Sequence, residues 1–273
     1  MRIHRALARA GIASRRKAEE LVAAGRVTVN GVVARTGQSV DPSVDRISVD
    51  GTALPAAPTL FEWIVLNKPP GVVTTKKDPE GRRTVFELVP EVPGLTYVGR
   101  LDYLTEGVLL LTTDGEAAHV LTHPSNEIER TYVATVRGDV RAAVAQARRG
   151  VELEDGMVYP SAVEGRPLGN RTSEFEVTLV EGRNREVRRL CEALGLEVDR
   201  LVRVRFGPIS LGALEGGKTR ALTMRERHDL EDVLGRKLGD RVESSRKSRP
   251  AASPGRKPSG GGSPRGRPRK KSR

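Results

Sequence analysis

The sequence predicts an α+β protein in which two folded domains are followed by a basic tail. The chain of 273 residues is long enough for one or two domains with a sizeable core. Short alternating or β-branched runs that end in Gly, Asn-Gly or Asp-Gly predict strands, and amphipathic helical segments lie between them. The composition changes to Ser, Pro, Gly, Arg and Lys near residue 241. We expect domains at 1–51 and 61–236, a linker at 52–60 and a disordered basic tail at 241–273.

A helix is expected over residues 15–24 of the first domain. Ser14 can accept a hydrogen bond from its first turn, and Gly25 can end it. Three adjacent cations occupy the first turn: Arg15, Arg16 and Lys17. The helix dipole disfavours positive charge at this end, so the cluster either serves an anionic ligand or is a solvated surface. Charge alone favours the solvated surface.

Short strands are expected after this helix. Residues 27–34 place two β-branched segments around Asn30-Gly31, and residues 47–51 repeat the signal with Asp50-Gly51. Both patterns are typical of strands joined by tight turns. Residues 52–60 contain two prolines and no charged residue, which is typical of a linker.

The positive charge of the chain is concentrated in the tail. The net charge is +12, and residues 241–273 hold 12 Lys and Arg against one Glu, so residues 1–240 carry a net charge of +1. The tail has too few apolar residues to offset its ordering entropy. It attracts nucleic acid by neutralising phosphates, or it only solubilises the protein; we expect it to contact RNA. A membrane role is less favoured, because no amphipathic helix or lipidation motif accompanies the charge.

Composition excludes several classes of protein. The single cysteine, Cys191, cannot form a disulfide within the chain, and the four histidines lack ligand spacing, so no metal site is expected. The N-terminus has no apolar signal segment, and no apolar run approaches the roughly 20 residues that span a bilayer. We therefore expect a soluble, cytoplasmic protein.

The second domain contains strand and helix signals. Apolar and β-branched runs predict strands at residues 61–66, 129–138 and 177–180. Asn184 can cap a helix over residues 185–195. The apolar stripe of that helix consists of Val187, Leu190, Cys191 and Leu194. Cys191 is therefore expected in the core and not as a nucleophile.

One carboxylate occupies a position typical of catalytic groups. Asp102 lies between Arg100 and a Thr-x-Gly turn, directly before the apolar run 108–111. Asp disfavours strands and Gly107 weakens an element interior, so this segment predicts a loop that leads into a buried strand. Catalytic groups are often held on a loop fixed by a rigid element, although an arbitrary loop Asp is more often solvated.

This segment closely resembles the catalytic motif of the RsuA-type family of ribosomal RNA pseudouridine synthases, G-R-L-D-x-x-T-x-G-L-L-L-L-T-x-D-G. Residues 99–115 depart from that motif only at Val108. Residues 67–71 match the family's N-K-P-x-G, and residues 130–132 match its K/R-x-Y.

Two further matches extend the resemblance over roughly residues 1–236. Residues 181–190 resemble E-G-R-N-R-Q-V-R-R-M, with Glu186 for Gln and Leu190 for Met. Residues 13–31 resemble A-S-R-R-x-A-x-x-L-I-x-x-G-x-V-x-V-N-G, the pattern of the small RNA-binding domain first seen in ribosomal protein S4.

The resemblance implies an S4-type domain followed by a pseudouridine synthase domain built on a mainly antiparallel mixed sheet with flanking helices. It implies that Asp102 is the essential carboxylate, that Tyr132 packs on the target base and that Arg188 pairs with Asp102. From the residues alone, Tyr132 is a half-buried strand residue and Arg188 a solvated helix residue. The implied RNA-binding residues are Arg15, Arg16, Lys17, Lys68, Arg100, Arg183 and Arg185. Lys68 is either structural or RNA-facing, and Glu186 adds negative charge near the presumed RNA face.

The implied activity is isomerisation of a specific uridine in ribosomal RNA, closest to the branch that acts on 23S rRNA. The reaction involves no redox change and no group transfer, so no cofactor is expected. Asp102 attacks C1′ or acts as a base at C2′, and the sequence leaves both open. The expected partner is ribosomal RNA or a pre-ribosomal subunit, with no membrane, and the chain is expected to be a monomer. The alternatives are a non-catalytic RNA-binding ribosome-assembly factor and a family member that acts on 16S rRNA or tRNA.

Overall fold

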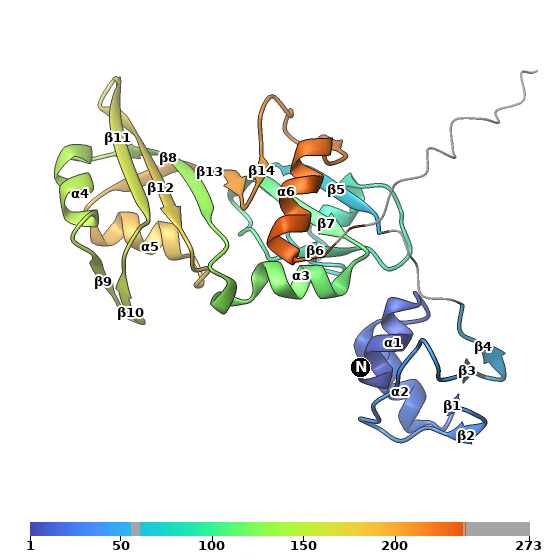
Figure 1. The fold of residues 1–273 in the computed structure, drawn as a ribbon. Coiled ribbons are helices and arrows are strands. Elements are labelled where there is room, and N and C mark those ends of the chain that lie inside the picture. The colour runs from blue at the N-terminus through green and yellow to red at the C-terminus, as the bar shows by residue number, and fades with distance from the viewer. Residues whose placement is uncertain (56–60, 237, 239–273) are drawn as a thin grey trace, which may run out of the picture. The chain divides into compact units, whose positions relative to one another are not determined.

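The computed structural model describes residues 1–55, 61–236 and 238 (Figure 1). The tail expected at 241–273 and residues 56–60 of the expected linker lie outside these residues. The first domain contains α1 (Ile3–Arg9), α2 (Arg15–Ala23), β1 (Val27–Val29), β2 (Val32–Val33), β3 (Ile47–Val49) and β4 (Thr52–Ala53). Its strands form an antiparallel sheet in the order β2-β1-β3-β4.

The first domain has its own core, to which both helices contribute. α2 begins as predicted, because the backbone N–H of Lys17 donates to the Ser14 hydroxyl at 3.3 Å. α1 was not predicted; its seven residues are too few for a clear periodic signal, and Ile3 and Leu7 anchor it in the core. β4 pairs with β3, so this domain extends beyond the expected boundary at residue 51.

The second domain carries the remaining elements. Its strands are β5 (Trp63–Lys68), β6 (Thr96–Val98), β7 (Thr105–Thr112), β8 (Arg130–Arg137), β9 (Val151–Leu153), β10 (Gly156–Val158), β11 (Ala162–Gly169), β12 (Thr172–Leu179), β13 (Glu197–Phe206), β14 (Ile209–Ser210) and β15 (Thr219–Arg220). Its helices are α3 (Gly115–Thr122), α4 (Val140–Ala147), α5 (Glu186–Ala193) and α6 (Met224–Leu234), with 3₁₀ turns at Val85–Leu88 and Pro124–Asn126.

A nine-stranded sheet forms the centre of this domain, in the order β11-β12-β8-β13-β7-β5-β15, with β14 beside β13 and β6 beside β7. β7 and β13 run parallel, and the other strand pairings in the described residues are antiparallel. The prediction of a mainly antiparallel mixed sheet with flanking helices is therefore confirmed. Figure 1 shows α4 and α5 beside the β8–β12 half of the sheet and α3 and α6 beside the β5–β7 half.

β7 is buried on both faces, which explains its uninterrupted apolar run. Val108 and Leu110 pack into a core with α3 and α6, whereas Leu109 and Leu111 pack into a second core with β5 and the 3₁₀ turn at 85–88. A strand covered on both faces has no polar alternation. This packing fixes the strand that follows the Asp102 loop.

α5 begins differently from the prediction. The expected cap, Asn184, is not at the N-cap; that position is held by Arg185, in the left-handed conformation with φ 47°. The carboxylate of Glu186 instead accepts a hydrogen bond from the N–H of Arg183 at 3.1 Å. None of the helices in the described ranges has the length and apolar composition needed to cross a membrane.

Candidate active site

A cleft of about 490 Å³ lies where β7, β8 and β13 adjoin in the main sheet. Its walls come from the loop before β7, from β8 and β13, and from the segment that leads into α5. The three predicted catalytic residues all line it: Asp102, Tyr132 and Arg188. Three of the predicted RNA-binding residues line it as well: Arg100, Arg183 and Arg185. The fold thus brings together residues that are far apart in the sequence.

Asp102 lies in a loop in which every backbone carbonyl from residue 101 to residue 105 accepts a hydrogen bond. Thr74 Oγ1, Thr105 N and Gly71 N donate to the carbonyls of Leu101, Asp102 and Tyr103 at 2.8, 3.0 and 2.9 Å, respectively. The side chains of Lys68 and Arg188 supply the remaining bonds. Because the loop is fixed along its whole length, the carboxylate of Asp102 starts from a defined position.

Lys68 is buried and positions this loop. Its side chain is 0% exposed. Its ammonium donates to the carbonyls of Pro69, Tyr103 and Thr105 at 3.0, 3.3 and 2.9 Å. Burial lowers the pKa of Lys68 to about 8, although the carboxylates of Asp102 and Glu106 oppose the change. Of the two alternatives for Lys68, its burial favours the structural one, because the end of a central strand directs this side chain into the protein.

Tyr132 lies on β8 and is half-buried. It packs against the hydrophobic clusters on both sides of the cleft, including Leu101 of the Asp102 loop. On the neighbouring strand, Arg203 lies directly opposite Tyr132 in the register. An aromatic ring that can stack on a base therefore lines the same cleft as Asp102.

The side chain of Arg188 contacts the backbone of the Asp102 loop. Its Nη2 donates to the carbonyl of Leu104 at 3.3 Å. Burial lowers the pKa of Arg188, and the neighbouring charge of Arg185 adds to this, while Asp102 acts in the opposite direction. The ion pairs formed by the described residues do not include one between Arg188 and Asp102. The expected direct pair is thus replaced by a hydrogen bond two residues further along the loop.

The three remaining predicted arginines of the cleft differ in availability. Arg100 and Arg185 are exposed. Arg183 is held within the protein, where it pairs with Glu181 at 2.7 Å and Asp155 at 3.3 Å. Arg183 is therefore a poor candidate for an RNA contact, because its guanidinium is already used, whereas Arg100 and Arg185 are open to a polyanion.

The predicted basic cluster of the first domain lies on one exposed surface of α2. Arg15, Arg16 and Lys17 are all exposed, and Lys17 pairs with Glu20 of the same helix at 2.7 Å. The cluster remains accessible to RNA phosphate.

Glu186 is not on an exposed RNA face, contrary to expectation. Its side chain is buried, and burial raises its pKa. One carboxylate oxygen accepts a hydrogen bond from the backbone N–H of Arg183, and the other, Oε1, has no hydrogen-bond partner and lies 3.7 Å from Nε of Arg183. This acidic residue in place of the family's Gln thus lies inside the wall of the cleft.

Two further arginines of the cleft were not identified from the sequence. Arg130 and Arg203 are buried, and their guanidinium groups lie 5.5 and 4.9 Å from the centre of the Phe206 ring. In sequence they resemble ordinary strand arginines, and only the pairing of β8 with β13 brings them together. The first residue of K/R-x-Y was the one signal that pointed to Arg130.

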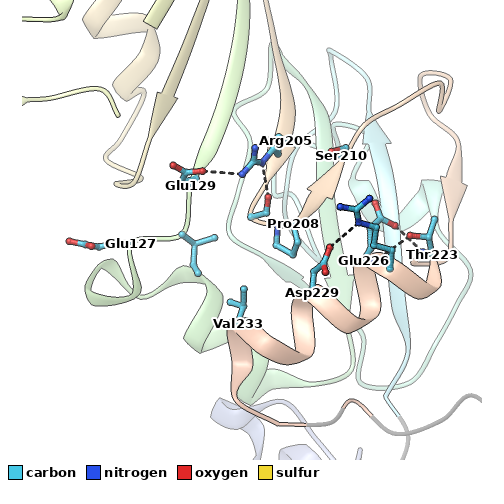
Figure 2. Close-up of a pocket in the computed structure, with 12 residues that line it drawn as sticks. Glu127, Glu129, Arg205, Pro208, Ser210, Thr223, Glu226, Asp229 and Val233 are labelled. Carbon is cyan, nitrogen blue, oxygen red and sulfur yellow. Dashed lines mark hydrogen bonds and ion pairs between the residues drawn. The ribbon is translucent and has the colours of Figure 1, made fainter. Parts of the chain in front are cut away.

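A second hollow, of about 740 Å³, lies between α6 and the turn after β13 (Figure 2). Most of its charged side chains are paired: Glu129 with Arg205, Asp229 with Arg225, and Glu226 with Arg220. None of the predicted catalytic residues lines it. We therefore assign the chemistry to the cleft around Asp102.

The described residues do not support catalysis by a cysteine nucleophile or by a bound metal ion. Cys191 is buried in the core, and burial raises its pKa to about 12, so it is not a nucleophile. No group of His, Cys, Asp and Glu side chains there could hold a metal ion.

Comparisons with known proteins agree with this geometry. A family model described as RNA pseudouridylate synthase matches residues 62–193, and one described as S4 domain matches residues 1–45. The chain is 42% identical over 241 residues to an uncharacterized RNA pseudouridine synthase of Aquifex aeolicus, which covers 87% of this chain and 96% of that protein. It is 45% identical to ribosomal large subunit pseudouridine synthase B of Pseudomonas aeruginosa, over 86% of this chain and 63% of that protein.

A solved structure is also similar. A crystal structure of a pseudouridylate synthase superposes with a TM-score of 0.57 and 26% identity, over 84% of this chain and 99% of that chain. Together with the cleft, these similarities show that the chain belongs to the RsuA-type family of RNA pseudouridine synthases, in which an S4 domain precedes the synthase domain.

Proposed function

We propose that this enzyme converts a specific uridine of ribosomal RNA to pseudouridine and that the target lies in 23S rRNA. The name of the Pseudomonas aeruginosa relative, a large-subunit enzyme, supports this substrate. The exposed basic cluster on α2 and the exposed Arg100 and Arg185 supply cations for phosphate contacts. The reaction takes place in the cytoplasm, where ribosomes are assembled, and the chain acts as a monomer.

The observation that carries this proposal is the fixed position of Asp102 beside Tyr132 and Arg188. The N1–C1′ bond of the uridine breaks with its electron pair on the uracil. Asp102 either bonds to C1′ or removes the C2′ proton to leave a C1′=C2′ double bond. After the ring turns, C5 bonds to C1′ as Asp102 leaves C1′ or returns the proton to C2′, and the C5 proton is lost while N1 gains one. A duplex hides the base, so the nucleotide is extruded onto Tyr132.

The rival function is RNA binding without catalysis. Such a factor has no use for a carboxylate whose loop is fixed at five consecutive carbonyls in the wall of a cleft. A family member that acts on 16S rRNA or tRNA remains the other alternative, and it differs only in the RNA that is modified.

The test is a map of pseudouridine in the RNA of cells that lack this gene and carry a plasmid-borne copy. We expect the wild-type gene to restore one 23S site and Asp102→Asn to restore none, because the amide keeps the shape but cannot serve as nucleophile or base. The purified variant should still bind RNA.

Asp199→Asn is the matched control. Asp199 lies on β13 and pairs with Arg137 at 2.7 Å, outside the cleft. This variant should restore the site. Turnover by Asp102→Asn above background would overturn the catalytic assignment, and a restored site in 16S rRNA or tRNA would overturn the 23S assignment alone.

A further inference from the structure

We propose that Arg203 is a further catalytic residue: its guanidinium binds the edge of the extruded uracil and stabilises the negative charge that the ring carries while it is detached from the sugar. This inference rests on the proposed function. It gives a role to a buried cation in the cleft that the sequence did not single out.

The register of the sheet places Arg203 beside the proposed stacking residue. Arg203 of β13 lies directly opposite Tyr132 of β8, and Leu201 of β13 lies opposite Thr105 of β7. Residues directly opposite each other share a face of the sheet, with Cβ atoms about 4.5–5.5 Å apart in an antiparallel pair. Arg203, Tyr132, Thr105 and Leu201 all line the cleft. A base stacked on Tyr132 therefore lies within reach of the Arg203 side chain.

Arg203 is a buried cation that the protein does not neutralise. It is 2% exposed, and its Nε donates to the carbonyl of Val108 at 2.8 Å. Its Nη2 is buried without a hydrogen-bond partner. Within the described residues, neither Arg203 nor the neighbouring Arg130 forms an ion pair. A buried guanidinium that lacks both an anion and a full set of acceptors is costly, and a ligand that supplies them binds well.

Other polar groups that line the cleft also have a buried atom without a hydrogen-bond partner. The hydroxyl of Thr105 and Oε1 of Glu186 are also buried without a hydrogen-bond partner, although Oε1 lies 3.7 Å from Nε of Arg183 in an ion pair. Arg130 differs from Arg203, because its Nη1 already donates to the carbonyls of Ile128, Val180 and Glu181 at 2.7, 2.8 and 3.2 Å. Of the two arginines, Arg203 is the one with a buried nitrogen, Nη2, that has no hydrogen-bond partner, and a ligand that accepts from it offsets this cost.

Depth favours the uracil over a backbone phosphate as the occupant. A phosphate stays with the sugar–phosphate backbone at the protein surface, where exposed cations such as Arg100 and Arg185 meet it. An extruded base is the part of RNA that enters a pocket of this kind. Uracil offers the carbonyl oxygens O2 and O4, which accept hydrogen bonds from a guanidinium.

The uracil becomes negatively charged during the reaction, so its contact with Arg203 is strongest while the ring is detached from the sugar. When N1–C1′ breaks, the bonding electron pair stays on the ring and spreads over N1, O2 and O4. Arg203 transfers no proton; it holds this anion until C5 attacks C1′ and N1 is protonated. A fixed donor aimed at developing charge in a site that excludes water is an effective form of catalysis.

The test compares Arg203→Met with wild type on an RNA that carries either uridine or 5-fluorouridine at the target position. Fluorine stabilises the uracil anion, so the rate at which the N-glycosidic bond of 5-fluorouridine breaks should depend less on Arg203. We expect single-turnover cleavage of the N-glycosidic bond to slow about 100-fold with uridine and clearly less with 5-fluorouridine. The dissociation constant for RNA should change little.

Arg205→Met is the matched control. Arg205 lies on the same strand, is exposed and pairs with Glu129 at 3.0 Å outside the cleft (Figure 2). This variant should cleave both RNAs at the wild-type rate. Arg203→Lys keeps the charge in a smaller group; it covers the case in which Arg203→Met fails to fold, and it should show a smaller loss with the same dependence on fluorine.

Three results would overturn the inference. A folded Arg203 variant with the wild-type rate removes the catalytic role. An equal loss with uridine and 5-fluorouridine assigns Arg203 a role in shape alone. A loss that lies mainly in RNA affinity assigns it to a phosphate. If the wild-type enzyme itself modifies no ribosomal RNA, the proposed function fails first, and the two failures are thereby distinguished.

Discussion

At the scale of single residues, the site depends on buried cations that serve different ends. Lys68 donates to carbonyls of the Asp102 loop, whereas Nη2 of Arg203 is buried without a hydrogen-bond partner. Both are among the largest fully buried side chains. Burying a charge lowers the stability of the folded state unless a partner compensates for it. Each of these two cations is therefore expected to lower the folding stability of the domain in return for its role in the site.

We predict that Lys68→Met changes both pH dependence and turnover. The pKa of Lys68 is lowered to about 8 from its ordinary 10.5. Between these values the unfolded chain binds more protons than the folded one, so the free energy of unfolding rises with pH across this window, by at most about 3 kcal/mol. Urea unfolding of wild type should show this increment, and Lys68→Met should lack it. Single-turnover rates should fall about 100-fold because the Asp102 loop loses two anchors.

Lys77→Met serves as the control, because Lys77 is exposed. It should retain the wild-type rate and the wild-type change in stability with pH. An identical pH dependence in wild type and Lys68→Met would show that Lys68 is not buried as a charged group.

At the scale of elements, the pairing of β7 with β13 decides the geometry of the cleft. Gly107 lies inside β7 opposite Arg203, with φ +105°. A Cβ at this position would lie 2.1 Å from the carbonyl oxygen of Arg203. Because Gly weakens a strand, the sequence predicts a loop at Gly107, but here the missing side chain allows the two strands to approach.

We predict that Gly107→Ala destabilises the synthase domain by about 3 kcal/mol or more, because strain from φ and a backbone clash add. Gly212→Ala is the control: Gly212 has φ +58° and open space around its Cβ position, so it should cost about 1 kcal/mol for φ alone. Chemical unfolding measures both. Equal effects of the two substitutions would mean that β7 and β13 do not pack as described.

At the scale of the whole molecule, positive charge is divided between the folded domains and the tail. Residues 1–240 are nearly neutral, with a net charge of +1, so within the domains RNA binding depends on local groups such as the cluster on α2. Residues 241–273 carry a net charge of +11 of the chain's +12.

We predict that deletion of residues 241–273 weakens RNA affinity and lowers the slope of log K against log salt, because fewer phosphates are neutralised. The modified uridine should stay the same, since phosphate contacts position RNA and do not read its sequence. Titrations at several salt concentrations test this, with a tail of equal length in which Gln replaces Lys and Arg as the control. An unchanged slope would show that the tail does not contact RNA.

Local signals in the sequence predict the order of the domains, the helix α2 with its Ser14 cap and the segments that carry Asp102, Tyr132 and Arg188. These follow from local signals, in which capping, periodicity and motif spacing involve residues close together in the chain. The folded chain was needed to show that Lys68 is buried beside the Asp102 loop, that Arg188 donates to the Leu104 carbonyl, and that Arg203 lies opposite Tyr132. These contacts arise from pairing and burial between segments that are distant in the sequence, and the residues next to a lysine or arginine do not indicate which way its side chain points.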